Sequence, residues 1–232
     1  MNKKKNSNQT FAITVFIGII VLLGALFFVS KAQDKNAEKE FPTIAGVNDV
    51  KVNGFDIEKQ PTIGNKLAKI EVVEFGDYKC PICKDWNKLV FPELKSQYID
   101  KNLISFSFMN YPFISKDSNL AALASEVVYD YDKNAFWKFH EEVYANQGDE
   151  TKTWATKEKL TDIAKSVIPN LDEAQFKKDL YKKSSMRSVA TDKAIAEHYK
   201  VNGTPTIFVN GKQVENPSFE AIKAAIDAEL NK

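Results

Sequence analysis

The only two cysteines in this 232-residue chain, Cys80 and Cys83, are separated by Pro81 and Ile82 alone. They follow a run rich in β-branched residues, 69–75, which predicts a buried strand, and they precede apolar residues at helical spacing. The pair therefore lies at a strand-to-helix junction, where the first sulfur meets the free N–H groups and the positive dipole end of a helix. Both favour a thiolate, so the junction predicts an α/β fold with a reactive thiol.

The spacing of the pair suggests what each sulfur does. The second sulfur lies one helical turn beyond the first, close enough to form a disulfide or to release a mixed one. We predict that Cys80 is the attacking, more exposed thiol and Cys83 the resolving one. Pro81 suits the first helical turn, because its missing N–H would have no partner there.

Three other interpretations of the pair remain open. A structural disulfide closing so short a loop would contribute only about 2 kcal/mol. A zinc site needs about four ligands, and only His140 and His198 could join the cysteines. Two buried free thiols would be unusual in an oxidising compartment. Redox catalysis is the favoured interpretation, and we expect no metal.

The amino terminus contains a long apolar run. Residues 11–29 carry no charge and follow Lys3, Lys4 and Lys5. As a helix they would extend roughly 28 Å, close to the thickness of a bilayer core. We predict that residues 1–32 are a membrane anchor, or a signal peptide cleaved after Ala32 if the protein is secreted. The run exceeds a usual signal-peptide core, which favours the anchor. In either case the lysines stay cytoplasmic, and the rest of the chain is extracytoplasmic.

The overall composition excludes some classes of protein. The chain has 32 Lys and Arg against 31 Asp and Glu, so no bulk basic charge is available for a nucleic acid, and no nucleic-acid partner is expected. Its 44% hydrophobic content is sufficient for a folded core.

Residues 33–54 are expected to form a tether and an amino-terminal extension. We predict an edge strand within residues 41–65 and further strands at 103–109, 206–209 and 212–214, with Asn210-Gly211 as a hairpin turn. Pro92 should end or kink the helix after the cysteines. Several helices are expected between residues 117 and 199, the first capped by Asp117 or Ser118 and the last starting at Ser188. Asn216 and Pro217 should open a terminal helix.

Three motifs together resemble the DsbA-like thiol:disulfide oxidoreductases of the thioredoxin superfamily, especially the membrane-anchored, extracytoplasmic branch of Gram-positive bacteria. They are Gln-Pro-Thr-Ile-Gly-Asn at 60–65, Val-Val-Glu-Phe-Gly-Asp-Tyr-Lys-Cys-Pro-Ile-Cys at 72–83, and Gly-Thr-Pro-Thr at 203–206. The resemblance covers residues 55–232. It implies a thioredoxin fold with an inserted helical domain at about residues 112–186.

The resemblance also implies roles for single residues. Cys80 and Cys83 match the redox pair, and Glu74 matches the buried acid that moves protons when Cys83 attacks or leaves. Pro205 matches the cis-proline opposite the disulfide, and the Thr204 backbone would pair with a substrate strand. Pro81 and Ile82 would also contact the substrate, and we expect an exposed apolar patch around Tyr78, Ile82 and the 204–205 loop.

The implied function is that of a disulfide oxidase that acts on reduced exported proteins. The resemblance implies reoxidation by a quinone-linked membrane thiol oxidase and no cofactor beyond the Cys80–Cys83 disulfide. Strongly oxidising members carry Pro-His between the cysteines, whereas this chain has Pro81-Ile82, so we expect the pKa of Cys80 to be lowered less than theirs. A reductase or isomerase, and a non-catalytic surface binding domain with a structural disulfide, are the alternatives.

Overall fold

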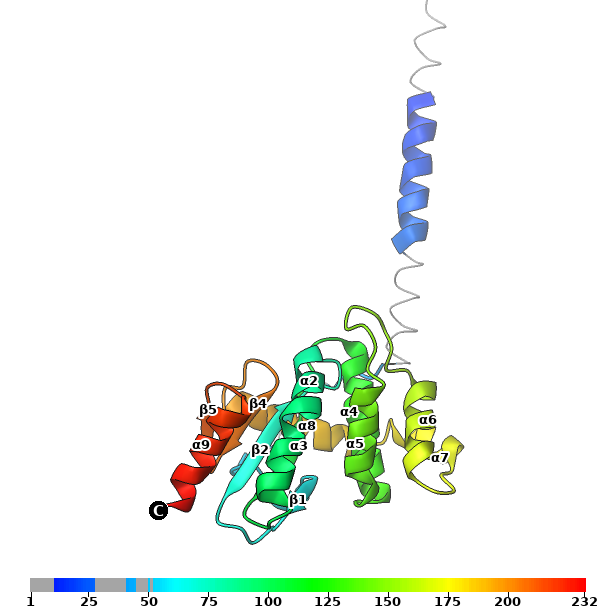
Figure 1. Cartoon of the computed structure of the whole chain (residues 1–232). Helices are drawn as coiled ribbons and strands as arrows, with labels where there is room; N and C mark the ends of the chain where they lie inside the picture. The colour runs from blue at the N-terminus through cyan, green and yellow to red at the C-terminus, as the bar shows by residue number, and fades with distance from the viewer. Residues whose placement is uncertain (1–10, 28–40, 45–49, 51) are drawn as a thin grey trace, which may run out of the picture. The chain divides into compact units, whose positions relative to one another are not determined.

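The computed structural model describes residues 11–27, 41–44, 50 and 52–232. The chain divides into two units, Met1–Phe41 and Pro42–Lys232. In the first unit, residues 11–27 form an α-helix (Figure 1). No helix within the described ranges is both long and apolar enough to cross a membrane, so the span predicted over residues 11–29 is not supported. The cleavage position after Ala32 and the start of the predicted tether lie outside the described residues.

The second unit contains a five-stranded sheet in the order β1-β3-β2-β4-β5. Its strands are β1 (Thr62–Gly64), β2 (Glu71–Gly76), β3 (Ser105–Asn110), β4 (Thr206–Val209) and β5 (Lys212–Val214). The central pair, β2 and β3, is parallel, and the other neighbours are antiparallel. The predicted strands are confirmed, including an edge strand, β1, within residues 41–65.

The helices follow the predicted order along the chain. They are the 3₁₀ turn η1 (Ile57–Lys59), α2 (Pro81–Leu89), α3 (Phe91–Leu94), the π-helical turn η2 (Lys95–Ile99), α4 (Lys116–Tyr131), α5 (Ala135–Ala145), α6 (Lys157–Val167), α7 (Glu173–Asp179), α8 (Lys183–His198) and α9 (Phe219–Leu230). The break predicted at Pro92 is confirmed. Helix α2 ends at Leu89, and the proline lies in the first turn of α3, where its missing N–H is tolerated.

Apolar clusters cover both faces of the sheet. Val72 of β2 packs with Trp86 of α2 and Ile222 of α9 on one face. Val73 and Phe75 of β2 pack with Ile195 of α8 on the other. Figure 1 shows α2, α3 and α9 on one side of the strands and α8 on the opposite side. Alternate residues of β2 therefore face two different cores.

The predicted hairpin turn at Asn210-Gly211, between β4 and β5, is confirmed. Asn210 and Gly211 both have positive φ, 46° and 78°. A two-residue turn with left-handed conformation at both positions matches the twist of antiparallel strands, which explains why asparagine and glycine occupy it.

Three predicted helix starts are wrong. Ser115 caps α4 in a capping box with Ser118, because the Asp117 carboxylate is bonded elsewhere. Helix α8 begins at Lys183, ahead of Ser188. Ser218 caps α9 by accepting a hydrogen bond from the Ala221 N–H, whereas Asn216 accepts from the Ser218 N–H in the preceding turn. Neighbouring polar residues compete for each cap, and local sequence does not decide among them.

The helical block inserted between β3 and α8 is confirmed. Helices α4 to α7 follow β3, and contacts join α4 to α5 and α5 to α6. Helix α5 also contacts α2, the helix that follows the cysteines. The insertion therefore borders the cysteine pair directly.

Candidate active site

Cys80 is the N-cap of α2. Its backbone is extended, and its sulfur accepts a hydrogen bond from the Cys83 N–H at 3.4 Å. Pro81 occupies the first helical position, as predicted. The strand β2 ends at Gly76, so the short segment after it delivers the sulfur to the amino terminus of the helix.

The Thr204–Pro205 peptide bond is cis. It directly precedes β4, which pairs antiparallel with β2. The loop that contains it therefore lies at the carboxyl end of β2, the same end of the sheet as the cysteines. The Cys80 thiol donates a hydrogen bond to the Thr204 carbonyl oxygen at 3.3 Å. The structure therefore brings Cys80, Thr204 and Pro205 together, with the cis geometry that the resemblance implied.

The pKa values of the two cysteines are shifted in opposite directions. Both cysteines are free thiols, and Cys80 is 6% exposed whereas Cys83 is 0% exposed. The hydrogen bond with the Cys83 thiol is the main cause that lowers the pKa of Cys80 from 9.0 to about 6, against the effect of burial. Burial, and then the bond to Cys80, raise the pKa of Cys83 well above 9.0. Cys80 is thus the thiolate at neutral pH and the more exposed sulfur, as predicted.

Glu74 lies on β2 with no exposed surface. Neither carboxyl oxygen has a hydrogen-bond partner among the described residues. Burial, and then the negative charge of Cys80, raise its pKa well above 4.5. The charge of Glu74 in turn raises the pKa of Cys83, which shows that the two groups interact. The structure therefore places a buried carboxyl group with a raised pKa close enough to Cys83 to influence its acidity.

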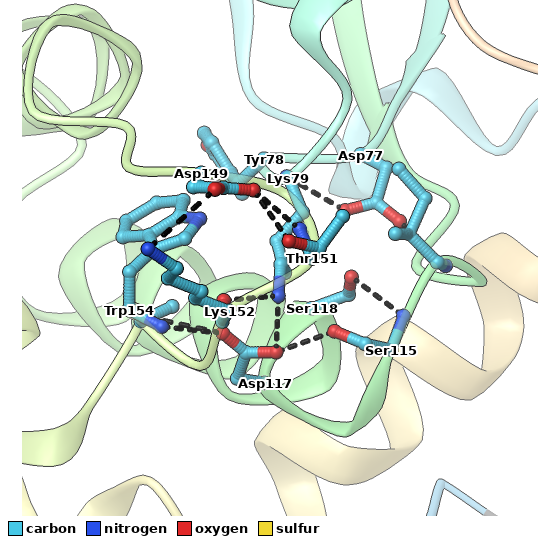
Figure 2. A network of polar contacts seen from close by, with 12 residues as sticks. Asp77, Tyr78, Lys79, Ser115, Asp117, Ser118, Asp149, Thr151, Lys152 and Trp154 are labelled. Carbon is cyan, nitrogen blue, oxygen red and sulfur yellow. Dashed lines mark hydrogen bonds and ion pairs between the residues drawn. The ribbon is translucent and has the colours of Figure 1, made fainter.

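Lys79, the residue before Cys80, is buried in an ion pair. Its ammonium group lies 2.8 Å from the Asp117 carboxylate, and both side chains are almost fully buried, at 1% and 2% exposed. The ammonium also donates to the Lys152 carbonyl oxygen at 2.9 Å. Figure 2 shows how the pair joins the active-site segment to the start of α4 and to the loop around Lys152.

Both carboxylate oxygens of Asp117 accept hydrogen bonds. The Ser115 hydroxyl donates to one carboxylate oxygen, and the Trp154 and Ala155 N–H groups donate to the other at 3.0 and 3.2 Å (Figure 2). Burial alone would raise the pKa of Asp117, but the bonds from Lys79, Ser115 and the backbone lower it below 3.8. The carboxylate is therefore held in its charged form.

Two further side chains fix the segment before Cys80. Asp77 accepts hydrogen bonds from the Lys79, Phe113 and Ile114 N–H groups. Gln147 donates its side-chain amide to the Tyr78 and Cys80 carbonyl oxygens at 2.8 and 2.9 Å. The helical insertion thus holds the active-site backbone from both sides.

The prediction of an exposed apolar patch around Tyr78, Ile82 and the 204–205 loop is partly wrong. Pro81 and Ile82 are exposed, the latter at 64%. Tyr78 is only 1% exposed, because its hydroxyl shares a hydrogen bond of 3.0 Å with the buried His140 Nδ1. Pro205 is buried and Thr204 is partly buried. Within this set, Pro81 and Ile82 are the side chains most open to a substrate.

Sequence reasoning missed the roles of Lys79 and Gln147 and the ion pair of Asp117. A lysine beside a cysteine resembles any surface lysine, and its partner is 38 residues away in the sequence.

The thioredoxin family model matches residues 56–228. A probable disulfide bond formation protein D of Bacillus cereus is 38% identical over 231 residues, which cover 99% of this chain and 100% of the relative. The disulfide bond formation protein D of Bacillus subtilis is 41% identical over 175 residues, which cover 75% of this chain and 78% of the relative.

Solved structures agree with these sequence matches. The oxidised form of BdbD from Bacillus subtilis gives a TM-score of 0.73 at 39% identity, and the match covers 80% of this chain and 100% of that structure. DsbA from Chlamydia trachomatis, 21% identical with a TM-score of 0.69, shares the fold. Because the family model spans most of the chain and the full-length relatives share more than a third of its residues, this protein belongs to the thioredoxin family, as a DsbA-like thiol:disulfide oxidoreductase.

Proposed function

We propose that the protein is a disulfide oxidase that transfers the Cys80–Cys83 disulfide to reduced exported proteins. The observation that supports this most directly is the position of Cys80. Its sulfur caps a helix, its pKa is lowered to about 6, and in the thiol form it reaches the Thr204 carbonyl of the cis-proline loop. A thiolate that is stable at neutral pH is a good leaving group in disulfide exchange.

The first step breaks the disulfide of the enzyme. A thiolate of the substrate attacks the Cys80 sulfur, and the Cys80–Cys83 bond breaks as a mixed disulfide forms. Cys83 leaves as a buried thiolate with a raised pKa, so it takes the proton of Glu74 beside it. Pro81, Ile82 and the Thr204–Pro205 loop would contact the substrate chain, with the Thr204 backbone pairing with an extended strand.

The second step releases the product. A second substrate thiolate attacks the substrate sulfur of the mixed disulfide and expels Cys80 as a thiolate. Two electrons have then passed from two substrate thiols to the cysteine pair. The enzyme is left as a dithiol, with both Cys80 and Cys83 as free thiols, as in the structure.

The lowered pKa of Cys80 favours this direction by a limited amount. Between an ordinary value of 9.0 and about 6, the reduced form gains on the order of 1 kcal/mol at pH 7. For a two-electron couple this is on the order of tens of mV, below the roughly 150 mV between thioredoxin and DsbA. An active site with Ile82 in place of histidine is therefore a moderate oxidant on this contribution alone.

The remaining partners are part of the proposal. A quinone-linked membrane thiol oxidase would reoxidise the dithiol. The lysine-flanked apolar segment at residues 11–29 would direct the catalytic unit to the extracytoplasmic side. The redox-active disulfide would be the only cofactor.

The test is oxidation of reduced, unfolded ribonuclease A by the oxidised full-length protein. We expect stoichiometric formation of substrate disulfides, none with Cys80→Ser, and a covalent mixed disulfide with Cys83→Ala. Equal oxidation by Cys80→Ser would overturn the proposal.

The direction needs a separate measurement. Equilibration of the cysteine pair with glutathione gives its reduction potential. A value near that of thioredoxin, about −270 mV, would instead favour the reductase or isomerase alternative.

A further inference from the structure

Unpaired polar atoms gather behind Cys83, in the region enclosed by β2, α2 and α5. They are both carboxyl oxygens of Glu74, the side-chain nitrogen of Asn87, the hydroxyl of Tyr144 and the Nε2 atom of His140. Most buried polar atoms in proteins have a partner, so several unpaired groups in one place require an explanation. The steps proposed above use Glu74 and Cys83 and leave Tyr144 without a role.

The Tyr144 hydroxyl, from α5, and the Glu74 side chain, from β2, lie over the same face of the sheet. Glu74 and Gly76 are two residues apart, so they point to the same side. A Cβ built on Gly76 would lie 3.0 Å from the Tyr144 hydroxyl oxygen and 2.5 Å from a ring carbon of Phe108. Phe108 is the residue paired with Glu74 across the sheet. The Tyr144 hydroxyl therefore lies next to Gly76, the residue on β2 that follows Glu74 on the same face of the sheet.

Helices α2 and α5 connect this region to solvent. Asn87 follows Cys83 by one turn of α2 and faces the same side. Asn87 and Tyr144 also line a groove between the two helices with a volume of about 510 Å³. The other residues that line it are Lys84, Lys88, Glu141 and Ala145. Lys88 and Glu141 are exposed, so the groove leads from the surface to the Tyr144 side chain.

We propose that Tyr144 relays protons between solvent in the α2–α5 groove and the Glu74–Cys83 pair. The inference rests on the proposed function, because it concerns the proton that Cys83 takes when it leaves the disulfide. Glu74 gives that proton to the Cys83 thiolate and becomes a carboxylate. Through a bridging water, the Tyr144 hydroxyl donates its proton to Glu74 while it accepts one from water in the groove. One proton moves inward and no electron passes through Tyr144.

The surroundings of Tyr144 keep its hydroxyl neutral, as a relay requires. Burial raises its pKa well above 10.0, and the charges of Cys83, Glu74, Tyr78 and Asp77 raise it further. A neutral hydroxyl can donate and accept a hydrogen bond at the same time. The neighbouring ring of His140, with its centroid 5.0 Å away, is itself uncharged near neutral pH, because burial lowers its pKa to about 3.

The test is Tyr144→Phe in the oxidised full-length protein. The measurement is the single-turnover rate at which dithiothreitol opens the Cys80–Cys83 disulfide, at fixed pH and ionic strength, against imidazole buffer concentration. We expect the variant to be about tenfold slower at low buffer and to speed up as imidazole supplies protons through the groove. The wild-type rate should not depend on buffer concentration.

Tyr98→Phe is the matched control. Tyr98 is also a buried tyrosine, and its hydroxyl donates to Asp227 at 2.9 Å. It lies just ahead of β3, at the opposite end of the parallel β2–β3 pair from the cysteines. This variant should exchange at the wild-type rate and show no response to buffer.

Two outcomes would overturn the relay. One is a Tyr144→Phe protein that reacts at the wild-type rate at all buffer concentrations. The other is a slow variant that imidazole does not rescue, which would indicate a structural role only. Failure of the proposed function looks different, because the wild-type protein itself would then not exchange with dithiothreitol, or Cys80→Ser would exchange equally well.

Discussion

The regions on either side of the cysteine pair differ in whether their buried ionisable groups are hydrogen-bonded. Ahead of Cys80, the Lys79–Asp117 pair is fully hydrogen-bonded and holds its charges. Behind Cys83, Glu74 and Tyr144 are equally buried and have no hydrogen-bond partner within the described part of the chain. Complete pairing fixes a geometry, whereas unpaired groups of raised pKa are free to exchange protons. The first region therefore holds the active site in place, and the second contains the groups to which we assign proton transfer.

The largest effect on stability should come from breaking the paired region. Lys79→Met leaves the buried Asp117 carboxylate without its counter-ion, so we expect a loss of about 3–5 kcal/mol in the free energy of unfolding. Urea unfolding of the reduced protein measures it.

Lys95→Met is the matched control for this prediction. The Lys95–Asp100 pair is exposed, at 38% and 52%, and its loss should cost less than about 1 kcal/mol. If both variants lost the same small amount, the Lys79–Asp117 pair would not hold the segment in the way described.

The unpaired region should respond in rate rather than in stability. Glu74→Gln removes an acid and keeps its shape, so we expect disulfide exchange at neutral pH to slow by about 10- to 100-fold. The free energy of unfolding should stay equal or rise, since no hydrogen bond is lost. Stopped-flow exchange and urea unfolding measure the two quantities.

Glu71→Gln, on the same strand and half-buried, should change neither quantity. A Glu74→Gln protein that exchanges as fast as the wild type would contradict the proton transfer assigned to Glu74.

The acidity of Cys80 predicts a pH dependence that connects the two regions. The pKa of Cys80 is about 6 in the folded reduced protein and 9.0 ordinarily, so the folded state binds the proton more weakly. The resulting stability of the reduced form is complete above pH 9 and is lost as pH falls through 6, with on the order of 1 kcal/mol present at pH 7.

Denaturant unfolding of the reduced protein between pH 5 and 9, compared with Cys80→Ser, isolates this contribution. The difference between the two should grow toward high pH. A difference that is flat with pH would show that the folded structure does not stabilise the Cys80 thiolate.

The smallest effect on stability is expected outside both regions, at Ile82. Because this side chain is 64% exposed, Ile82→His should change the free energy of unfolding by less than about 0.5 kcal/mol. An imidazolium beside the thiolate should lower the pKa of Cys80 below about 6 and make the pair more oxidising. Thiolate absorbance at 240 nm and glutathione equilibration measure both, and an unchanged pKa would contradict the importance assigned to this position.

The parts of the fold that depend on local chemistry could be predicted from the sequence. The β-branched run before the cysteines, the Asn210-Gly211 turn and the Pro92 break each specify a conformation within a few residues. The cysteine spacing likewise specified which thiol is more exposed, because Cys80 precedes α2 as its N-cap whereas Cys83 lies inside the first turn, on the buried side of the helix.

The parts that depend on distant partners could not be predicted. Asp117 pairs with a lysine on another element, so the cap falls to Ser115. Tyr78 was expected at the surface, but a histidine from α5 accepts or donates at its hydroxyl and buries it. Tyr144 has the spacing of any core aromatic residue, and the sequence does not show that its hydroxyl lies against Gly76, two residues beyond Glu74 on β2.

The sheet ends in two very short strands, β1 (Thr62–Gly64) and β5 (Lys212–Val214). Each offers only a few backbone groups for an incoming strand, and Lys212 and Gln213 of β5 are exposed. Short edge strands, and the charge of Lys212 on β5, resist edge-to-edge pairing. If the substrates arrive as unfolded, extended chains, as proposed above, such edges would favour their release over aggregation with the enzyme.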